Sequence, residues 1–413
     1  MHESLVWQRR LLQNGVRLLL YPKPSALTAQ FSVAVQYGSN DDTDEQAGAA
    51  HFLEHMLAGG SPRRIDLSRE VERLGGSADF STNHEYTLCS ADVMPSKLSA
   101  ATRVSSELFS DLCFCEEQFN SEREIILHEL AELEDDPREK VSEMLVECLF
   151  KTHPVRRPVG GYTKTVRQLS LDALSDVFRQ RYVPQNLILI LTGNFSEKDV
   201  AVAEEDFCCL PQFPASAKLT QDSEWGAPEK LAAKTKAGLS QTYLSIGART
   251  TCMAHPDVPA LDLLNVVLGA GASSRLFIEL REKRGLTYDV GTSQVEGSDF
   301  GYLCINCAVK QSRVDDAQRL IRVELSRLRN ENVPEEELNK AKDMILGDIF
   351  RGVDNAQSCP EILTLMEIQF GDEHALLDYV NQVRVVTAIE VRDVANKYLQ
   401  EDQLATAVLT SKN

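Results

Sequence analysis

The chain of 413 residues is 43% hydrophobic and 25% charged, which suits a globular protein of about two or three domains and excludes extensive disorder. Its 43 Lys and Arg are outnumbered by 62 Asp and Glu, and the net charge of −19 argues against nucleic acid or an anionic membrane as the main partner. The same charge would attract a basic peptide.

The N-terminal residues show no basic start followed by an apolar segment, and the longest aliphatic run, LILIL at 187–191, is too short to span a membrane. The ten cysteines lack the spacing of a disulfide framework. Cys304 and Cys307 form a C-x-x-C pair, but no second pair completes a four-thiolate zinc site, so ordinary strand positions are favoured for both. We expect a cytoplasmic protein with reduced thiols, provided that no leader was removed.

The first half of the chain alternates between extended and helical patterns. Strands are predicted at 16–21, 30–37, 77–93 and 187–192, and helices around His51, at about 67–74, over about 96–150 and near 171–181. This order of strands and helices predicts an α+β fold, with strands on one side and helices on the other.

The predicted helix around His51 contains the motif HFLEH, residues 51–55, within a run of small and apolar residues. Side chains at i, i+3 and i+4 share one face of a helix, so His51, Glu54 and His55 converge. Burying them without partners would cost about 2–7 kcal/mol for each group. Two neutral imidazoles one turn apart can clamp zinc, with the glutamate placed as a base, and H-x-x-E-H is the reverse of the H-E-x-x-H zinc-protease helix. A chance cluster of core and surface residues is the alternative.

A later helical segment, FNSEREIILHELAEL at 119–133, carries two glutamates inside its apolar stripe. Glu122 and Glu129 are seven residues apart and nearly superposed, whereas Glu124 and Glu132 point elsewhere. A metal-ligating carboxylate with a supporting carboxylate behind it accounts for both residues. A pair of carboxylates at the edge of the core, satisfied by Arg or backbone donors, accounts for the pattern equally well.

The second half of the chain repeats the first at an interval of about 210–220 residues. EEQFNSEREIILHEL at 116–130 resembles EEELNKAKDMILGDI at 335–349, and FSVAVQYGS at 31–39 resembles TYLSIGART at 242–250. An interval of this length predicts two copies of one domain and not a solenoid of short repeats.

The repeat sets the expected domain boundaries. We expect a zinc-binding first domain at 1–212, an irregular linker at 213–230 and a homologous second domain at 231–413. In the second copy the segment from Asp262 to Val266 falls opposite HFLEH, so the second domain has lost the metal clamp.

HFLEHM, followed about 75 residues later by SEREIILHEL, resembles the inverted-zincin peptidases of the pitrilysin, insulin-degrading enzyme and mitochondrial processing peptidase group. The resemblance implies that Glu129 is the third ligand of one zinc ion per chain, beside His51 and His55. It implies that Glu122 is an accessory acid in the catalytic site. It further implies two repeated domains, each an antiparallel-rich sheet packed against helices, which together form half of a clamshell.

The resemblance extends along nearly the whole chain. SSRLFIELREKRGLTYDV at 273–290 resembles the second-domain segment whose Arg and Tyr help to hold the substrate, here Arg281 and Tyr288. Without the resemblance, a cation near a helix C-terminus and an ordinary strand aromatic would be the favoured interpretations of these two residues. GGSADFSTNHEYT resembles the family's substrate-pairing strand. The substrate-binding residues that this implies are Ala78, Asp79, Phe80, Ser81 and Thr82.

The chain departs from the family pattern in two places. Asp79 stands where the family usually has Asn in an N-A-x-T pattern, which removes an amide donor and adds a charge beside the scissile bond. The residues Ala58, Gly59 and Gly60 replace the commoner aromatic-containing turn after the metal helix. Neither change touches the predicted zinc ligands.

We therefore expect a zinc metalloendopeptidase in which Glu54 is the general base, and which cleaves peptides or presequence-like segments bound as an added β-strand in an enclosed chamber. Basic peptides are candidate substrates, and a homodimer is the expected assembly, with a heterodimer as the alternative. A non-catalytic scaffold subunit of a peptidase-like complex is the rival from another class. A peptidase dedicated to processing one substrate is the rival among enzymes.

Overall fold

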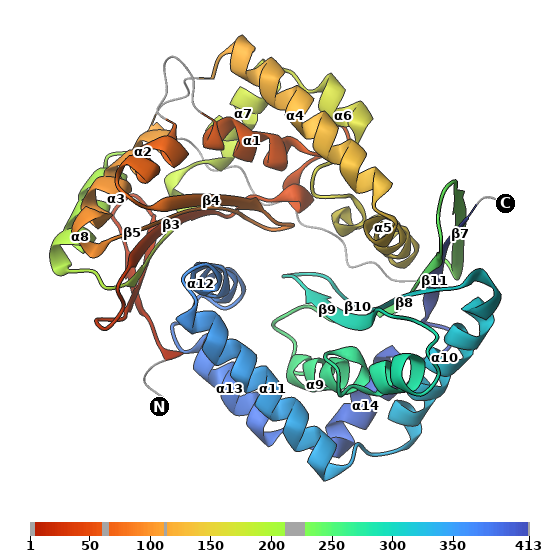
Figure 1. Ribbon diagram of the computed structural model, residues 1–413. Coiled ribbons are helices and arrows are strands. Elements are labelled where there is room, and N and C mark those ends of the chain that lie inside the picture. The colour runs from red at the N-terminus through yellow and green to blue at the C-terminus, as the bar shows by residue number, and fades with distance from the viewer. Residues whose placement is uncertain (1–4, 60–65, 111–113, 211–227, 412–413) are drawn as a thin grey trace. The chain divides into compact units, whose positions relative to one another are not determined.

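The computed structural model describes residues 5–59, 66–110, 114–210 and 228–411, which form two compact units (Figure 1). Each unit is discontinuous in sequence. The first comprises Met1–Ala131, Arg157–Thr220 and Arg351–Leu377, and the second comprises Glu132–Arg156, Gln221–Phe350 and Asp378–Asn413. None of the helices in the described residues is both long enough and apolar enough to cross a membrane.

The first unit is built on a six-stranded sheet in the order β1-β2-β6-β3-β5-β4. The aliphatic run LILIL forms β6 at the middle of this sheet, where its side chains are buried on both faces. The pair β2 and β6 is parallel, the other pairs are antiparallel, and β4 is an edge strand. The strands are β1 (Gln8–Leu11), β2 (Arg17–Pro22), β3 (Ala29–Val35), β4 (Ser77–Thr82), β5 (Thr87–Val93) and β6 (Leu187–Gly193).

Helices cover both faces of this first sheet, with α1 and α2 on one face and α12 on the other (Figure 1). The main core lies on the α1 side, where Phe52, Leu53 and Phe119 pack against strand residues such as Phe31 and Val33. The helices are α1 (Ala49–Ala58), α2 (Leu67–Arg73), α3 (Leu98–Ser110), α4 (Glu116–Asp135), α6 (Thr163–Gln168), α7 (Leu171–Arg181), α8 (Glu197–Cys208) and α12 (Ser358–Gln369), with short 3₁₀ turns at Ser39–Asp41, Pro95–Lys97 and Pro184–Asn186.

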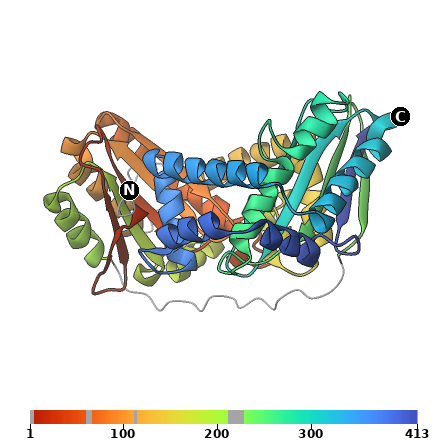
Figure 2. The same cartoon turned by 90° about the horizontal axis from the view of Figure 1, so that it is seen from below.

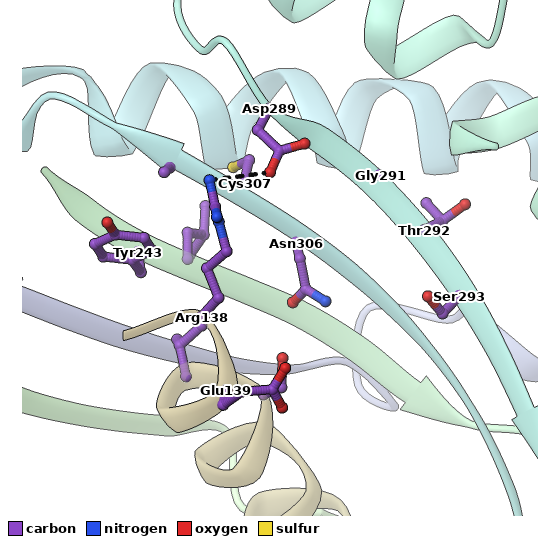
Figure 3. Close-up of a pocket in the computed structure, with 13 residues that line it drawn as sticks. Arg138, Glu139, Tyr243, Asp289, Gly291, Thr292, Ser293, Asn306 and Cys307 are labelled. Atoms are coloured by element: carbon purple, nitrogen blue, oxygen red, sulfur yellow. Dashed lines mark ion pairs between the residues drawn. The ribbon is translucent and has the colours of Figure 1, made fainter. Parts of the chain in front are cut away.

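The second unit repeats this plan with a five-stranded sheet in the order β7-β11-β8-β10-β9. Again one pair, β7 with β11, is parallel and the other pairs are antiparallel, and β9 takes the edge position that β4 has in the first sheet. Figure 2 shows from a second side that the C-terminal strand lies among the strands of this sheet. The strands are β7 (Leu231–Lys236), β8 (Thr242–Arg249), β9 (Val290–Glu296), β10 (Gly301–Val309) and β11 (Ala405–Ser411).

Two apolar cores lie on the two faces of the second sheet. Leu145 and Leu149 pack with Ala407 on one face, and Leu264 and Ile305 belong to the larger core on the other. The helices are α5 (Pro137–Leu149), α9 (Val258–Gly269), a π-helical turn (Phe277–Glu282), α10 (Val314–Asn330), α11 (Glu335–Asp354), α13 (Ala375–Val385) and α14 (Ala388–Tyr398), with 3₁₀ turns at Pro154–Arg156 and Gln311–Arg313.

The predicted α+β class with two repeated sheet-and-helix units is confirmed. The segment Asp262 to Val266 lies on α9, which packs against β9 as α1 packs against β4. The units are not the contiguous halves drawn from the sequence, because α5 belongs to the second unit and α12 to the first. Most of the predicted linker, residues 213–227, lies outside the described residues.

Candidate metal centre

Helix α1 exposes one polar stripe and buries the remainder of its surface. Phe52, Leu53, Met56 and Leu57 are all buried in the core, whereas the three polar residues of HFLEH are only partly buried. The helix begins after Gly48, whose φ of +97° lies in the left-handed region that favours glycine. The apolar stripe therefore fixes the direction in which the two imidazoles and the carboxylate point.

Three of the predicted residues meet between α1 and α4. His51, His55 and Glu129 each offer one ligand atom, and these atoms lie within 4.8 Å of one another. The Oε2 atom of Glu129 is 3.3 Å from Nε2 of His55 and 3.8 Å from Nε2 of His51. Two imidazole nitrogens and a carboxylate oxygen at these separations are a donor set for a tetrahedral metal with one open position.

His51 is a partly buried imidazole whose surroundings keep it neutral, as a metal ligand must be. Burial, followed by the nearby His55, lowers the pKa of His51 to about 4, so its ring is neutral at pH 7. Its Nδ1 atom is buried without a hydrogen-bond partner among the described residues. A β-carbon on Gly160 would lie 3.6 Å from this nitrogen, an ordinary van der Waals separation, so the backbone of Gly160 lies beside the ring without crowding it. A metal bound at Nε2 would satisfy that nitrogen and so offset part of the cost of burying this ring, while the Nδ1 atom would stay without a hydrogen-bond partner among the described residues.

Glu122 lies behind His55 and not among the three converging ligand atoms. Its Oε2 atom is 3.3 Å from Nδ1 of His55, and both side chains are 15% exposed. Burial alone would lower the pKa of His55, but the hydrogen bond to Glu122 and the charges of Glu129 and Glu54 outweigh it and raise the pKa. A carboxylate at Nδ1 keeps the proton on that nitrogen and leaves Nε2 as the donor for a metal.

Glu54 shares the face of the two histidines but is not one of the three converging ligands. Its Oε2 atom accepts a hydrogen bond of 2.7 Å from the hydroxyl of Thr82 on β4. Burial raises the pKa of Glu54, with Glu129 and Asp79 adding to the rise and the Thr82 hydrogen bond and His55 opposing it. A carboxylate held beside a metal position without ligating it is suited to moving a proton.

The predicted substrate strand is β4, the edge of the first sheet. Ala78 and Phe80 pack against the core, while Asp79 is exposed on the opposite side with Ser77, as the two-residue period of a strand requires. Within the described residues β4 pairs only with β5, so its outer backbone edge is open. Ser81 pairs with Leu88 of β5 and is partly buried. An extended peptide can add to such an edge as a further strand.

The other predicted substrate contacts, Arg281 and Tyr288, lie in the second unit. The guanidinium carbon of Arg281 lies 4.3 Å from the centre of the Tyr288 ring and 4.7 Å from that of Phe277. Tyr288 is nevertheless 78% exposed, which is unusual for a large aromatic residue. The contact keeps the two side chains together at the surface of their unit.

The sequence analysis missed the residue that holds the start of the metal helix. Asp42 is only 3% exposed, and its carboxylate accepts hydrogen bonds from the backbone N–H of Gly48 at 2.9 Å and of Ala50 at 3.4 Å, and from the hydroxyl of Tyr37. Burial raises the pKa of Asp42 to about 7, although these hydrogen bonds and the charge of Arg157 oppose the rise. An acidic residue shortly before a helix is a capping signal that the sequence offered.

Two family descriptions match the sequence. The one described as Insulinase (Peptidase family M16) matches residues 17–163, the range that contains the three converging ligands and Glu54. The one described as Peptidase M16 inactive domain matches residues 168–345. An uncharacterized zinc protease of Mycobacterium tuberculosis is 30% identical over 412 residues, which cover 98% of this chain and 93% of that protein.

Two solved structures are similar to the fold described here. A protease from Helicobacter pylori superposes with a TM-score of 0.92 at 22% identity, over 98% of this chain and 99% of that chain. A peptidase M16 inactive domain from Pseudomonas fluorescens superposes with a TM-score of 0.88 at 23% identity, over 98% of both chains. The sequence identities are low, so these two likenesses concern the fold alone.

Proposed function

The chain belongs to the insulinase family of peptidases, family M16, and we propose that it is a zinc-dependent metalloendopeptidase. The observation that carries the proposal is the convergence of two imidazoles and one carboxylate to within 4.8 Å, with Glu54 on the same face of α1. Such a donor set is typical of catalytic zinc sites. Bound zinc would supply a Lewis acid that polarises the scissile carbonyl and makes water a better nucleophile.

The remaining catalytic roles are assigned to residues of the first unit. His51, His55 and Glu129 would hold the metal, and Glu122 would keep the proton of His55 on Nδ1. Glu54 would take a proton from the attacking water and deliver it to the leaving nitrogen. Each of these roles needs only atoms that α1 and α4 already bring together.

We propose that the substrate is an extended peptide that pairs with the open edge of β4. The carboxylates of Asp79 and of Glu361 on α12 have no hydrogen-bond or ion-pair partner among the described residues, and the pKa of Glu361 is raised by burial and by the charge of Asp79. Two unpaired carboxylates beside this edge support a preference for basic side chains in the peptide. Arg281 and Tyr288 are proposed as further substrate anchors.

The alternative is a non-catalytic scaffold subunit, since one matching description and one similar structure are titled as inactive domains. The inactive-domain description, however, covers residues 168–345, whereas the metal ligands lie within the range matched by the peptidase description. A subunit that only scaffolds a complex has no need of two histidines, a converging carboxylate and a partnered glutamate at one point. The arrangement therefore favours the enzyme.

The deciding experiment compares the wild type with Glu54→Gln. The wild-type protein should contain one zinc per chain and cleave members of a peptide library, with activity lost to a chelator and restored by zinc. Glu54→Gln should retain its zinc and lose at least about 10²-fold in kcat, because the base is removed and the ligands are kept. Glu45→Gln, an exposed position shortly before α1, is the matched control and should change neither property.

Zinc content and peptide hydrolysis are read separately in this experiment. A wild-type protein that binds zinc but cleaves no peptide in the library would contradict the enzymatic proposal and favour the scaffold. A metal-free Glu54→Gln protein would instead show that Glu54 is a ligand.

A further inference from the structure

Thr82, which the sequence analysis assigned to substrate binding, instead contacts Glu54, the proposed general base. Thr82 ends β4, and its hydroxyl donates to Oε2 of Glu54 at 2.7 Å. This charge-assisted hydrogen bond joins the edge of a sheet to a helix, and the two residues are 28 positions apart in the chain. It occupies one oxygen of the carboxylate and leaves Oε1 without a hydrogen-bond partner among the described residues.

We propose that Thr82 is a positioning residue that fixes the carboxylate of Glu54 through this hydrogen bond, so that Oε1 is the oxygen that accepts the proton. The inference rests on the proposed peptidase function. It assigns to Thr82 a contact with the base in place of a contact with the peptide.

The direction of the Thr82 side chain follows from the period of the strand. Successive side chains of a strand point to opposite faces, so Thr82 shares its face with Ala78 and Phe80, which pack against the core on the helix side. That face is covered by α1, which packs against β4. A peptide that pairs with the open edge would meet the backbone of β4, and the hydroxyl of Thr82 would stay turned toward the helix.

The local structure holds the hydroxyl in place before any substrate arrives. Threonine is β-branched, so its χ1 angle is restricted and little side-chain freedom is lost when the hydrogen bond forms. Thr82 pairs across the sheet with Thr87, whose own hydroxyl donates to the backbone oxygen of Tyr37 at 3.1 Å. The end of β4 is therefore anchored on its inner side, and a peptide added to the outer side would further order the strand that holds the base.

The test compares two substitutions at one position. Thr82→Val keeps the shape of the side chain and removes the hydroxyl, whereas Thr82→Ser keeps the hydroxyl. We expect Thr82→Val to lower kcat about tenfold, the effect of losing one hydrogen bond to a charged group, with KM and zinc content unchanged. Thr82→Ser should stay within about threefold of the wild type. Thr163→Val, which makes the same chemical change at an exposed position at the start of α6, is the matched control and should leave kcat unchanged.

A second measurement does not depend on activity. Crystal structures of the wild type and the two Thr82 variants should show the Glu54 carboxylate turned or disordered in Thr82→Val and unchanged in Thr82→Ser. A Thr82→Val protein with the wild-type kcat, or with the Glu54 carboxylate unmoved, would overturn the inference. Equal losses in both variants that track a lower melting temperature would overturn it too, because they would reveal a purely structural role.

The failure of the proposed function gives a different result. A wild-type protein without zinc-dependent cleavage would contradict the peptidase proposal, while the position of the Glu54 carboxylate in the variant crystals would still decide whether Thr82 holds it.

Discussion

The two histidines of α1 lie one turn apart but are held in different ways. The ring of His51 lies beside the backbone of Gly160, and its Nδ1 atom has no hydrogen-bond partner among the described residues. His55 is fixed by a hydrogen bond, with Glu122 at 3.3 Å from its Nδ1 atom. Among the described residues, only the imidazole of His55 therefore has a carboxylate behind its Nδ1 atom.

Replacing Glu129 by Gln should weaken metal binding itself. The amide keeps the size of the side chain but removes the negative charge that faces both Nε2 atoms, so we expect zinc affinity to fall by at least about tenfold. Competition with a chelator measures the change. Glu124→Gln, an exposed position on the same helix, is the control and should bind zinc as the wild type does. Full affinity in Glu129→Gln would remove Glu129 from the ligand set.

At the scale of the element, the N-terminus of α1 is tied down by one buried carboxylate. Asp42 accepts hydrogen bonds from the backbone of Gly48 and Ala50, directly before His51. A β-carbon on Gly48 would lie 2.6 Å from the backbone oxygen of Gly160, so the loop before the helix is also packed closely against a second segment. The metal helix is thus positioned by its first turn as well as by its apolar stripe.

Replacing Asp42 by Ala should destabilise the protein by about 2–4 kcal/mol, because it leaves the hydroxyl of Tyr37 and two backbone N–H groups buried without their acceptor. Chemical denaturation measures the loss. Glu45→Ala, an exposed position in the same loop, should change stability by less than about 0.5 kcal/mol. Similar stability of the two variants would show that Asp42 does not hold the helix.

In the second unit, α9 and β9 bring two carboxyl groups together. Burial raises the pKa of Glu296 to about 8, and the charge of Asp262 adds to the rise, while a hydrogen bond from Gln294 opposes it. Burial also raises the pKa of Asp262 to about 6, and its hydrogen bond from Tyr379 opposes that rise. The folded state therefore retains protons that the unfolded chain releases near pH 4.

This difference predicts how stability depends on pH. Between about pH 4 and pH 8 these two carboxyl groups bind more protons in the folded state than in the unfolded state, so their contribution to the free energy of unfolding should fall as pH rises. Glu296→Gln removes the group that must ionise, and we expect it to stabilise the protein at pH 8 by about 1–3 kcal/mol and to have little effect at pH 4. Denaturation curves at both pH values test this. A variant that is equally stabilising or destabilising at both would contradict the prediction.

At the scale of the whole molecule, the candidate centre and the proposed substrate anchors belong to different units. The three candidate metal ligands lie in the first unit, and Arg281 and Tyr288 lie in the second. We propose that the chain acts as a homodimer in which the anchors of one chain serve the metal centre of the other. A two-fold assembly of this kind contains both halves of the site twice and needs no different partner.

Mixing two inactive variants tests the shared site. If His51→Ala and Arg281→Ala chains exchange subunits, the mixed dimer should contain one intact centre and recover up to about half the native activity per dimer. Exchange can be followed with subunits of different mass, and mixing two samples of the same variant is the control. No recovery despite demonstrated exchange would place Arg281 and the metal in the same chain, or leave Arg281 without a catalytic role.

The sequence by itself determined the features that depend on local spacing. The H-x-x-E-H motif puts two imidazoles and a carboxylate on one face of any helix, and the short apolar run LILIL predicts the strand at 187–192. The long helical stretch after residue 96 was predicted without its breaks. One break was visible in the sequence, since Asp136 caps α5 and Pro137 occupies its first turn.

The tertiary structure decided which groups meet across the chain. The stripe of α4 left Glu122 and Glu129 equivalent, and only the packing of α4 against α1 places Glu129 at the Nε2 atoms and Glu122 at Nδ1 of His55. The contact of Thr82 with Glu54 depends on which face of β4 meets α1, and the assignment of α5 and α12 to their units depends on packing between segments far apart in the sequence. Spacing along one element fixes a face, but the partner of that face is set by the packing of whole helices and sheets.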